Sequence, residues 1–120
     1  MGSKTWEDPF MPTPLKDRQN VLITKKDHSF YPGADEYLKG DVLNKIKKLE
    51  KKYYNKDIFI IGGPDIIHQT FDLFKEFYLT RIYGNFKCDK FIDIEKIKVS
   101  MNLINKIDCD STCHFEIWRK

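Results

Sequence analysis

Short apolar runs alternate along the chain with stretches in which apolar residues recur at helical spacing. Runs at residues 20–24, 57–61 and 77–83 are rich in β-branched and aromatic residues and predict strands buried in a sheet. Segments 101–109 and 113–118 predict two antiparallel strands, joined by a turn at Asp110 and Ser111. Strands therefore account for much of the second half of the chain.

Two stretches show the apolar periodicity of helices. Behind Asp41, whose carboxylate is a suitable N-cap, the apolar positions are Val42, Leu43, Ile46 and Leu49. The run at 57–61 leads directly into Gly62, Gly63 and Pro64, and helical spacing then continues through Ile66, Ile67, Phe71 and Phe74. A strand, a glycine pair and a helix in this order make up half of a parallel crossover unit. A short helix is also expected around Trp6.

Prolines and glycines mark the connections between these elements. Pro9, Pro12 and Pro14 predict an irregular connector, and Pro32 with Gly33 predicts a turn within the polar stretch 25–40. The alternation of strands and helices predicts an α/β fold with a mainly parallel central sheet, flanking helices and an antiparallel C-terminal hairpin. We expect residues 1–120 to form a single domain.

Composition narrows the class of protein. The apolar fraction of 41% and the aromatic fraction of 14% are typical of a globular chain. Lysines are interleaved with acidic residues and the net charge is only +3, which disfavours a nucleic-acid partner. The sequence shows no membrane-spanning run and no secretion signal, so a cytoplasmic location is expected. The three cysteines, Cys88, Cys109 and Cys113, match no metal or redox spacing and are interpreted as free thiols.

Four segments carry candidate anion-binding groups. Gly62-Gly63 lies between a strand and a helix N-terminus, where backbone amides can approach an anion closely, although a plain tight turn explains the pair equally well. The segment 2–5 is another possible helix start, or the remnant of an expression vector. Thr24, Lys25 and Lys26 follow a strand and suit a phosphate, with a solvated loop as the alternative. Arg18 is suited to bind a carboxylate.

No metal site and no catalytic residue is predicted. His28, His68 and His114 have no Cys, Asp or Glu partner at ligand spacing, and no serine–histidine–acid pattern is present. The residues alone therefore indicate an α/β domain with several possible anion sites.

In this order, the motifs resemble those of the dihydrofolate reductase family. The matching segments are residues 1–7, 14–18 with 20–25, 58–63, 78–82, 89–91 and 114–118, so the resemblance extends over essentially the whole chain. It implies a three-layer fold around the central sheet and hydride transfer from NADPH to dihydrofolate. It also implies a cis peptide bond between Gly62 and Gly63.

The resemblance assigns roles to individual residues. The cofactor's pyrophosphate would lie at two helix N-termini, formed by Gly2, Ser3, Lys4 and Thr5 and by Gly62, Gly63, Pro64, Asp65, Ile66 and Ile67. Thr24 and Lys25, with Lys4, would receive the 2′-phosphate that distinguishes NADPH from NADH. Arg18 would pair with the α-carboxylate of the folate glutamate tail, with Leu15 against the aminobenzoyl ring. The Ile61 carbonyl and the Thr80 hydroxyl would lie at the pterin.

The sequence departs from the family pattern in several places. Ser3 replaces a basic residue, Ile67 a tyrosine beside the nicotinamide, and Lys90 a threonine. Met1 matches an internal position, so the family's N-terminal central strand and the acidic residue that holds the pterin have no counterpart. We therefore expect the chain alone to be unstable and to have little reductase activity.

Three other interpretations stay open. The chain is compatible with one half of a split reductase that needs an N-terminal partner segment to donate the central strand, or with a decayed, non-catalytic remnant. The related NADPH-dependent reductase domain of riboflavin biosynthesis shares the fold, but Arg18 and the segment around Thr80 favour a folate substrate.

Overall fold

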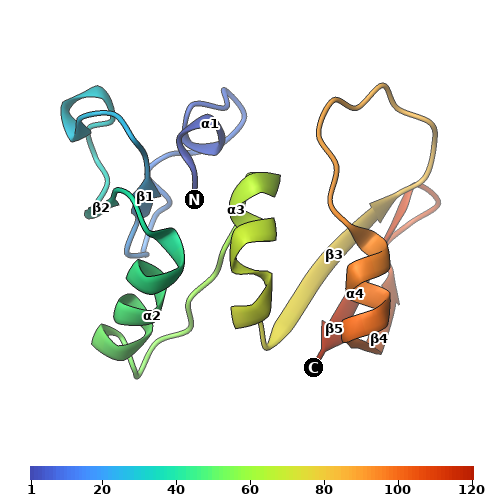
Figure 1. The fold of residues 1–120 in the computed structure, drawn as a ribbon. Coiled ribbons are helices and arrows are strands. Elements are labelled where there is room, and N and C mark those ends of the chain that lie inside the picture. The colour runs from blue at the N-terminus through green and yellow to red at the C-terminus, as the bar shows by residue number, and fades with distance from the viewer. The chain divides into compact units, whose positions relative to one another are not determined.

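The computed structural model describes all of residues 1–120, which form two compact units (Figure 1). The first unit comprises Met1–Thr70 and the second Phe71–Lys120. No helix combines the length and the apolar character that crossing a membrane requires.

The first unit contains four helices and one short parallel sheet. The helices are α1 (Ser3–Trp6), the 3-10 turn η1 (His28–Phe30), α2 (Val42–Lys52) and α3 (Pro64–Thr70). Strands β1 (Val21–Ile23) and β2 (Glu36–Leu38) pair in parallel, with Leu22 opposite Tyr37. The prediction of a strand at 20–24 is confirmed, whereas β2 lies in a stretch that the sequence indicated only as polar.

Buried apolar side chains hold the start of the chain against this sheet. Leu22 is fully buried and packs in a cluster with Trp6 and Tyr31, flanked by Met1 and Tyr37 among others. Burying an aromatic or aliphatic side chain of this size contributes about 1.5–3 kcal/mol. The cluster therefore positions α1 beside β1, where the candidate anion-binding residues lie.

Helix α2 begins and packs as its sequence pattern predicts. The Asp41 carboxylate accepts a hydrogen bond from the Asn44 amide, which satisfies one amide of the first turn. Ile46 and Leu49 are buried, and the lysines occupy the solvated face, where Lys52 reaches Glu36 of β2. The hydrogen bond from Lys52, with a second from a tyrosine hydroxyl, lowers the pKa of Glu36.

The strand predicted at 57–61 is not formed. The segment pairs with no strand, and its side chains are exposed, with Phe59 at 70% and Ile58 and Ile61 at about 40%. An apolar, β-branched run indicates that a segment favours burial. To form a strand, the segment also needs a neighbouring strand that pairs with its backbone N–H and C=O groups. Residues 1–120 place no such neighbour beside the segment.

The second unit is an antiparallel sheet with two short helices. Its elements are η2 (Phe71–Leu73), β3 (Glu76–Ile82), α4 (Ile94–Ser100), β4 (Asn102–Asp108) and β5 (Cys113–Arg119). The strand order is β3-β5-β4, so the last strand lies in the centre (Figure 1). The predicted strand at 77–83 and the predicted C-terminal hairpin are confirmed.

The α/β class is confirmed, but the sheet arrangement differs from the prediction. A mainly parallel central sheet was expected, whereas the parallel ladder has only the two short strands β1 and β2, and the larger sheet is entirely antiparallel. The absence of a ladder at 57–61 is the reason, because that run would have extended the parallel sheet. The three-layer arrangement and the single domain stay predictions.

One face of the antiparallel sheet carries a hydrogen-bond network of buried and partly buried polar side chains, centred on Glu116. Its carboxylate accepts hydrogen bonds from His114 Nε2 at 2.9 Å, Trp118 Nε1 at 2.8 Å and Arg81 Nε at 3.2 Å. Because a carboxylate only accepts, His114 Nε2 carries the proton, and its Nδ1 accepts from the Tyr83 hydroxyl at 2.7 Å. Burial raises the pKa of Glu116, but the hydrogen bonds from His114 and Trp118 and the charge of Arg81 outweigh it and lower the pKa.

Replacing Glu116 by Gln is expected to lower the free energy of unfolding at neutral pH by about 1–3 kcal/mol. Because the folded pKa lies below the unfolded one, this stabilisation is present above the unfolded pKa and is lost as the pH falls through the folded pKa. Urea unfolding should therefore show the two proteins converging below about pH 4. The exposed Glu95, which pairs with Lys98, provides the control Glu95→Gln. A constant difference across this pH range would contradict the assignment.

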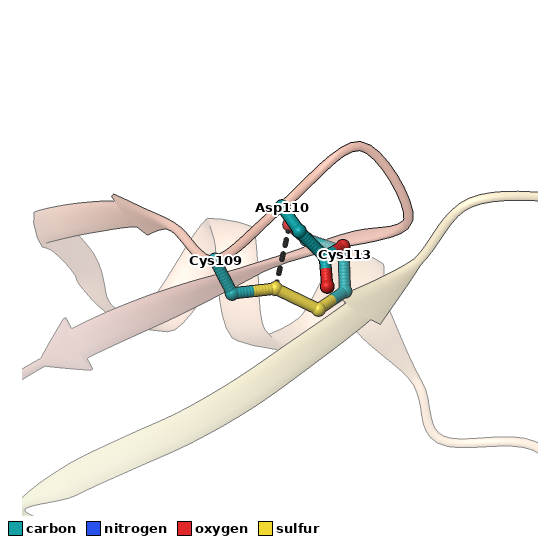
Figure 2. Close-up of side chains that lie close together, drawn as sticks. All are labelled: Cys109, Asp110 and Cys113. Atoms are coloured by element: carbon teal, nitrogen blue, oxygen red, sulfur yellow. Dashed lines mark hydrogen bonds between the residues drawn. A yellow bond between two sulfur atoms is a disulfide. The ribbon is translucent and has the colours of Figure 1, made fainter.

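Cys109 and Cys113 form a disulfide across the β4–β5 turn (Figure 2). The prediction of three free thiols is therefore wrong for these two residues and confirmed for the exposed Cys88. Sequence spacing did not suggest a pair, but the hairpin brings the two Cα atoms to 5.8 Å, within the range that a disulfide requires. Asp110 caps the turn by accepting from the Thr112 amide at 2.6 Å.

Removing this disulfide is expected to destabilise the hairpin by about 2 kcal/mol, the loop-entropy value for so short a loop. The variant Cys109→Ser/Cys113→Ser should show a lower thermal midpoint than the unmodified protein, and a dithiol reductant should remove the difference. Cys88→Ser serves as the control because Cys88 forms no disulfide. Identical midpoints under oxidising conditions would show that the bridge adds no stability.

Candidate functional site

Two glycine turns that are far apart in sequence meet in the first unit. The Gly2 amide donates to the Gly62 carbonyl at 2.8 Å, which joins the start of α1 to the turn before α3. Gly2 also forms a parallel bridge with Ile23, and the Ile23 amide donates to the Met1 carbonyl at 2.8 Å. The structure thus brings together the two predicted helix starts and the end of β1.

The backbones approach closely at this junction, and the conformation of Gly62 favours glycine there. A Cβ atom on Gly2 would lie 3.4 Å from Ile66 Cγ1, and one on Gly62 would lie 3.5 Å from Thr5 Oγ1. Gly62 also has a φ of +117°, a conformation that side chains disfavour. The peptide bond between Gly62 and Gly63 is cis, as the family resemblance implied.

The two helix starts present backbone amides. Gly2 is the N-cap of α1 and has no side-chain cap, so the amides of Ser3, Lys4 and Thr5 have no acceptor within the helix. At the second helix, the Ile66 and Ile67 amides already donate to the Gly63 carbonyl, at 3.0 and 3.1 Å, so only the amides of Gly63 and Asp65 are left for a ligand. Such amide-lined turns suit the oxygens of a phosphate group.

The other predicted residues of α3 differ in exposure and in the groups that a ligand could contact. Pro64 is the first residue of the helix, where a missing amide is tolerated, and Asp65 is exposed in the first turn. Ile67 is 8% exposed, so its side chain belongs to the interior of the unit. Its amide already donates to the Gly63 carbonyl, so the cofactor contact of Ile67 stays a prediction.

Thr24 and Lys25 follow β1 directly. The Thr24 amide donates to the Leu38 carbonyl at 3.0 Å, and its hydroxyl accepts from the Lys26 amide at 3.1 Å, so the turn is fixed while Thr24 is buried. Lys25 and Lys26 are exposed, as is Lys4 on α1. Because Gly2 bridges Ile23, the segments that carry these exposed lysines are close together, which favours an anionic ligand.

Leu15 and Arg18 lie on a tight turn that precedes β1. The side-chain amide of Asn20 holds this turn by accepting from the Leu15 amide at 2.8 Å and donating to the carbonyls of Leu15 and Arg18. Leu15 is half-buried and Arg18 is exposed. Sequence reasoning missed Asn20, although a polar residue at the start of a buried apolar run was a detectable signal.

The remaining two predicted residues lie in different units. Ile61 is 39% exposed and immediately precedes the glycine pair in the first unit. Thr80 lies on β3 in the second unit, opposite Phe115, and is exposed. Both therefore present polar groups at the surface of their own unit, the Ile61 carbonyl next to the glycine turn and the Thr80 hydroxyl on the sheet.

One cluster of potential metal ligands is present in the second unit. Atoms of Cys109, Asp110 and Cys113 lie within 4.8 Å of one another. Figure 2 shows that the two sulfurs are bonded to each other, which removes both thiolates as ligands.

Comparison with known proteins identifies a family. A family profile described as dihydrofolate reductase matches residues 1–115. The chain is 30% identical to dihydrofolate reductase of Saccharomyces cerevisiae over 82% of its own length and 52% of that relative's. It is 28% identical to dihydrofolate reductase of Staphylococcus aureus (strain Mu50), over 93% of the chain and 66% of the relative.

A third relative is not named as a reductase. The segregation and condensation protein A of Mycoplasma pneumoniae is 29% identical over 74% of the chain, which covers 17% of that protein. The chain thus spans between about half and two thirds of the reductases that it matches and a much smaller part of this longer protein.

Proposed function

This chain belongs to the dihydrofolate reductase family, and we propose that it binds NADPH and 7,8-dihydrofolate for hydride transfer to the pterin. The product would be tetrahydrofolate, the carrier for one-carbon and thymidylate metabolism, and the proposed location is cytoplasmic. The observation that carries the proposal is the junction of Gly2 with Gly62, which joins two amide-presenting helix starts. That junction supports a dinucleotide site more specifically than either turn does alone.

The proposed pyrophosphate site uses the first turns of α1 and α3. The amides of Ser3, Lys4 and Thr5 on one side and of Gly63 and Asp65 on the other suit phosphate oxygens. The glycine pair leaves a surface without side chains, because a Cβ at either glycine would point toward Thr5 Oγ1, 3.5–3.7 Å away. The residues therefore fit the group that the family implies.

The proposed 2′-phosphate site consists of Thr24 and Lys25, with Lys4. The buried Thr24 hydroxyl is held in place by the Lys26 amide, and the exposed lysines supply positive charge. Ser3 contributes a hydroxyl where the family usually has a cation, so the charge rests on the lysines. This arrangement supports a preference for NADPH over NADH.

The proposed substrate contacts come from Leu15, Arg18, Ile61 and Thr80. The exposed guanidinium of Arg18 is available for a bidentate pair with the α-carboxylate of the glutamate tail, and the half-buried Leu15 for packing on the aminobenzoyl ring. The family resemblance assigns the pterin to the Ile61 carbonyl as acceptor, and it proposes the Thr80 hydroxyl as a separate pterin contact. NADPH, when bound, supplies the hydride, while these residues bind and orient the acceptor.

A second candidate function is that of one half of a reductase completed by a strand-donating segment. The exposed apolar side chains of Ile58, Phe59 and Ile61 and the missing ladder at 57–61 favour it, because such an edge readily accepts a strand. We propose that this strand, with an acidic residue to support protonation of the pterin, is required for catalysis. The 120 residues alone are then expected to have little activity.

Adding a family N-terminal segment as a separate peptide tests this requirement. Dihydrofolate-dependent NADPH oxidation is expected to be absent with residues 1–120 alone and to appear when the peptide is added. A peptide with the acidic residue replaced by its amide provides the control, since it supplies the strand without the carboxylate. Full activity of residues 1–120 alone would contradict the requirement, and no activity with either peptide would favour a decayed remnant.

A further inference from the structure

A single buried amide organises the turn that carries Leu15 and Arg18. Asn20 is 4% exposed, and all three of its side-chain hydrogen bonds go to the backbone of this turn. Its oxygen accepts from the Leu15 amide at 2.8 Å, and its nitrogen donates to the Leu15 carbonyl at 2.9 Å and to the Arg18 carbonyl at 3.0 Å. Both amide protons and one lone pair are thus used within a single turn.

The Asn20 backbone is anchored separately to the strand next to β1. Its amide donates to the Asp35 carboxylate at 2.6 Å, and its carbonyl accepts from the Asp35 amide at 2.8 Å. Asp35 immediately precedes β2, and Glu36 also donates to the Asn20 carbonyl, at 3.2 Å. A continuous set of hydrogen bonds therefore connects the parallel sheet to the backbone of Arg18.

We infer that Asn20 is a positioning residue that sets Arg18 for the carboxylate of the folate glutamate tail. The inference rests on the proposed function, which gives Arg18 its ligand. Arg18 is exposed, and its side chain has no hydrogen-bond partner in the structure, so its direction depends on the backbone beneath it. A guanidinium pairs well with a carboxylate only when both N–H groups face it, so the orientation of this turn determines affinity for the tail.

The chemistry of this position requires asparagine. Aspartate has the same shape and retains the acceptor for the Leu15 amide, but it has no protons for the two carbonyl oxygens and adds a buried charge beside them. Serine retains at most one donor. Turn residue Asp17 has a positive φ of 58°, a conformation that non-glycine residues rarely adopt, so the turn depends on the side-chain hydrogen bonds of Asn20 to hold it.

The test compares ligands with and without the tail, using the full-length gene product. The variants are Asn20→Asp and Asn20→Ser, and Gln19→Glu is the matched control because it makes the same amide-to-acid change at an exposed neighbour. Dissociation constants are measured for dihydrofolate, for a reduced pteridine without the aminobenzoylglutamate tail, and for NADPH. Amide hydrogen exchange at Leu15 reports the turn directly.

Asn20→Asp is expected to weaken dihydrofolate binding about tenfold, a loss of about 1.4 kcal/mol, with Asn20→Ser showing a smaller loss. Binding of the tail-less pteridine and of NADPH should stay within about twofold, which also shows that the variant is folded. Leu15 exchange should accelerate. In an Arg18→Leu background, Asn20→Asp should cause a smaller loss than in the unmodified protein, because part of its effect acts through Arg18.

Equal losses for the tailed and tail-less ligands would overturn the inference, as would fully additive losses in the Arg18→Leu background. If Asn20→Asp does not fold, Asn20→Ser and the Leu15 exchange rate decide the question by the same criteria. An unmodified protein that binds the tail-less pteridine and dihydrofolate equally well overturns the role of Arg18 and this inference. An unmodified protein that binds neither overturns the proposed function itself.

Discussion

Replacing Gly62 by Ala is expected to weaken NADPH binding by about 100-fold, equivalent to about 3 kcal/mol of binding free energy. A Cβ at this position lies 3.5 Å from Thr5 Oγ1 and occupies the side of the turn that faces the first helix start. The φ of +117° adds strain for any side chain, so the turn should shift and the amides of the two helix starts should lose their common orientation. Isothermal titration with NADPH measures the effect.

Gly40 provides a matched control for backbone strain. It also has a positive φ, of +81°, but a Cβ there would meet no atom within 4 Å. Gly40→Ala and Gly62→Ala should both lower the free energy of unfolding, each by about 1–3 kcal/mol. Only Gly62→Ala should lose affinity for NADPH. A similar loss in both variants would mean that reduced stability, and not the site, explains the result.

Replacing Arg18 by Leu is expected to raise the KM for dihydrofolate by about 10-fold to 100-fold, because a bidentate, charge-assisted pair is lost. The affinity for NADPH should be unchanged, since the proposed cofactor residues lie on α1, α3 and the turn after β1. The measurement is steady-state kinetics with each substrate varied in turn. The assay contains the N-terminal peptide that the proposed function requires.

Lys16 is the matched control for Arg18. It is an exposed cation on the same turn, so Lys16→Leu removes the same charge without removing the proposed carboxylate contact. If only long-range electrostatic attraction matters, both variants should raise the KM equally. If Arg18 contacts the carboxylate directly, only Arg18→Leu should raise it. Equal increases in KM for the two variants would refute the assignment of the glutamate-tail contact to Arg18.

Local structure was largely predictable from the sequence because it depends on nearby residues. Asp41 caps α2 as expected, the glycine pair leads into α3, and the C-terminal hairpin forms at the predicted turn. In each of these cases the signal and the structure that it specifies lie within a few residues. The helix α4 is short and was not predicted, although Asp93 caps it.

Features that depend on distant partners were predicted less well. The run at 57–61 has the composition of a strand but no neighbour, so the ladder is missing and the apolar side chains are exposed. The Cys109–Cys113 disulfide is a local feature of the predicted hairpin, but it was missed because the spacing of two cysteines alone does not reveal a pair.

The candidate site combines both kinds of feature. The candidate anion-binding segments were identified individually from the sequence. The hydrogen bond from Gly2 to Gly62 joins residues that are 60 positions apart, so only the family resemblance predicted that they meet. Asn20 was missed because its role lies in hydrogen bonds to the backbone. Its place at the start of a buried apolar run marked the position but did not reveal this role.

The most direct test of the proposed function is dihydrofolate-dependent oxidation of NADPH by the full-length gene product, followed by absorbance and repeated with Gly62→Ala. We expect oxidation that requires dihydrofolate, prefers NADPH to NADH, and is strongly reduced in the variant at subsaturating NADPH. Oxidation that is independent of dihydrofolate, or that is unaffected by Gly62→Ala, would contradict the assignment of the Gly2–Gly62 junction as the cofactor site of a reductase.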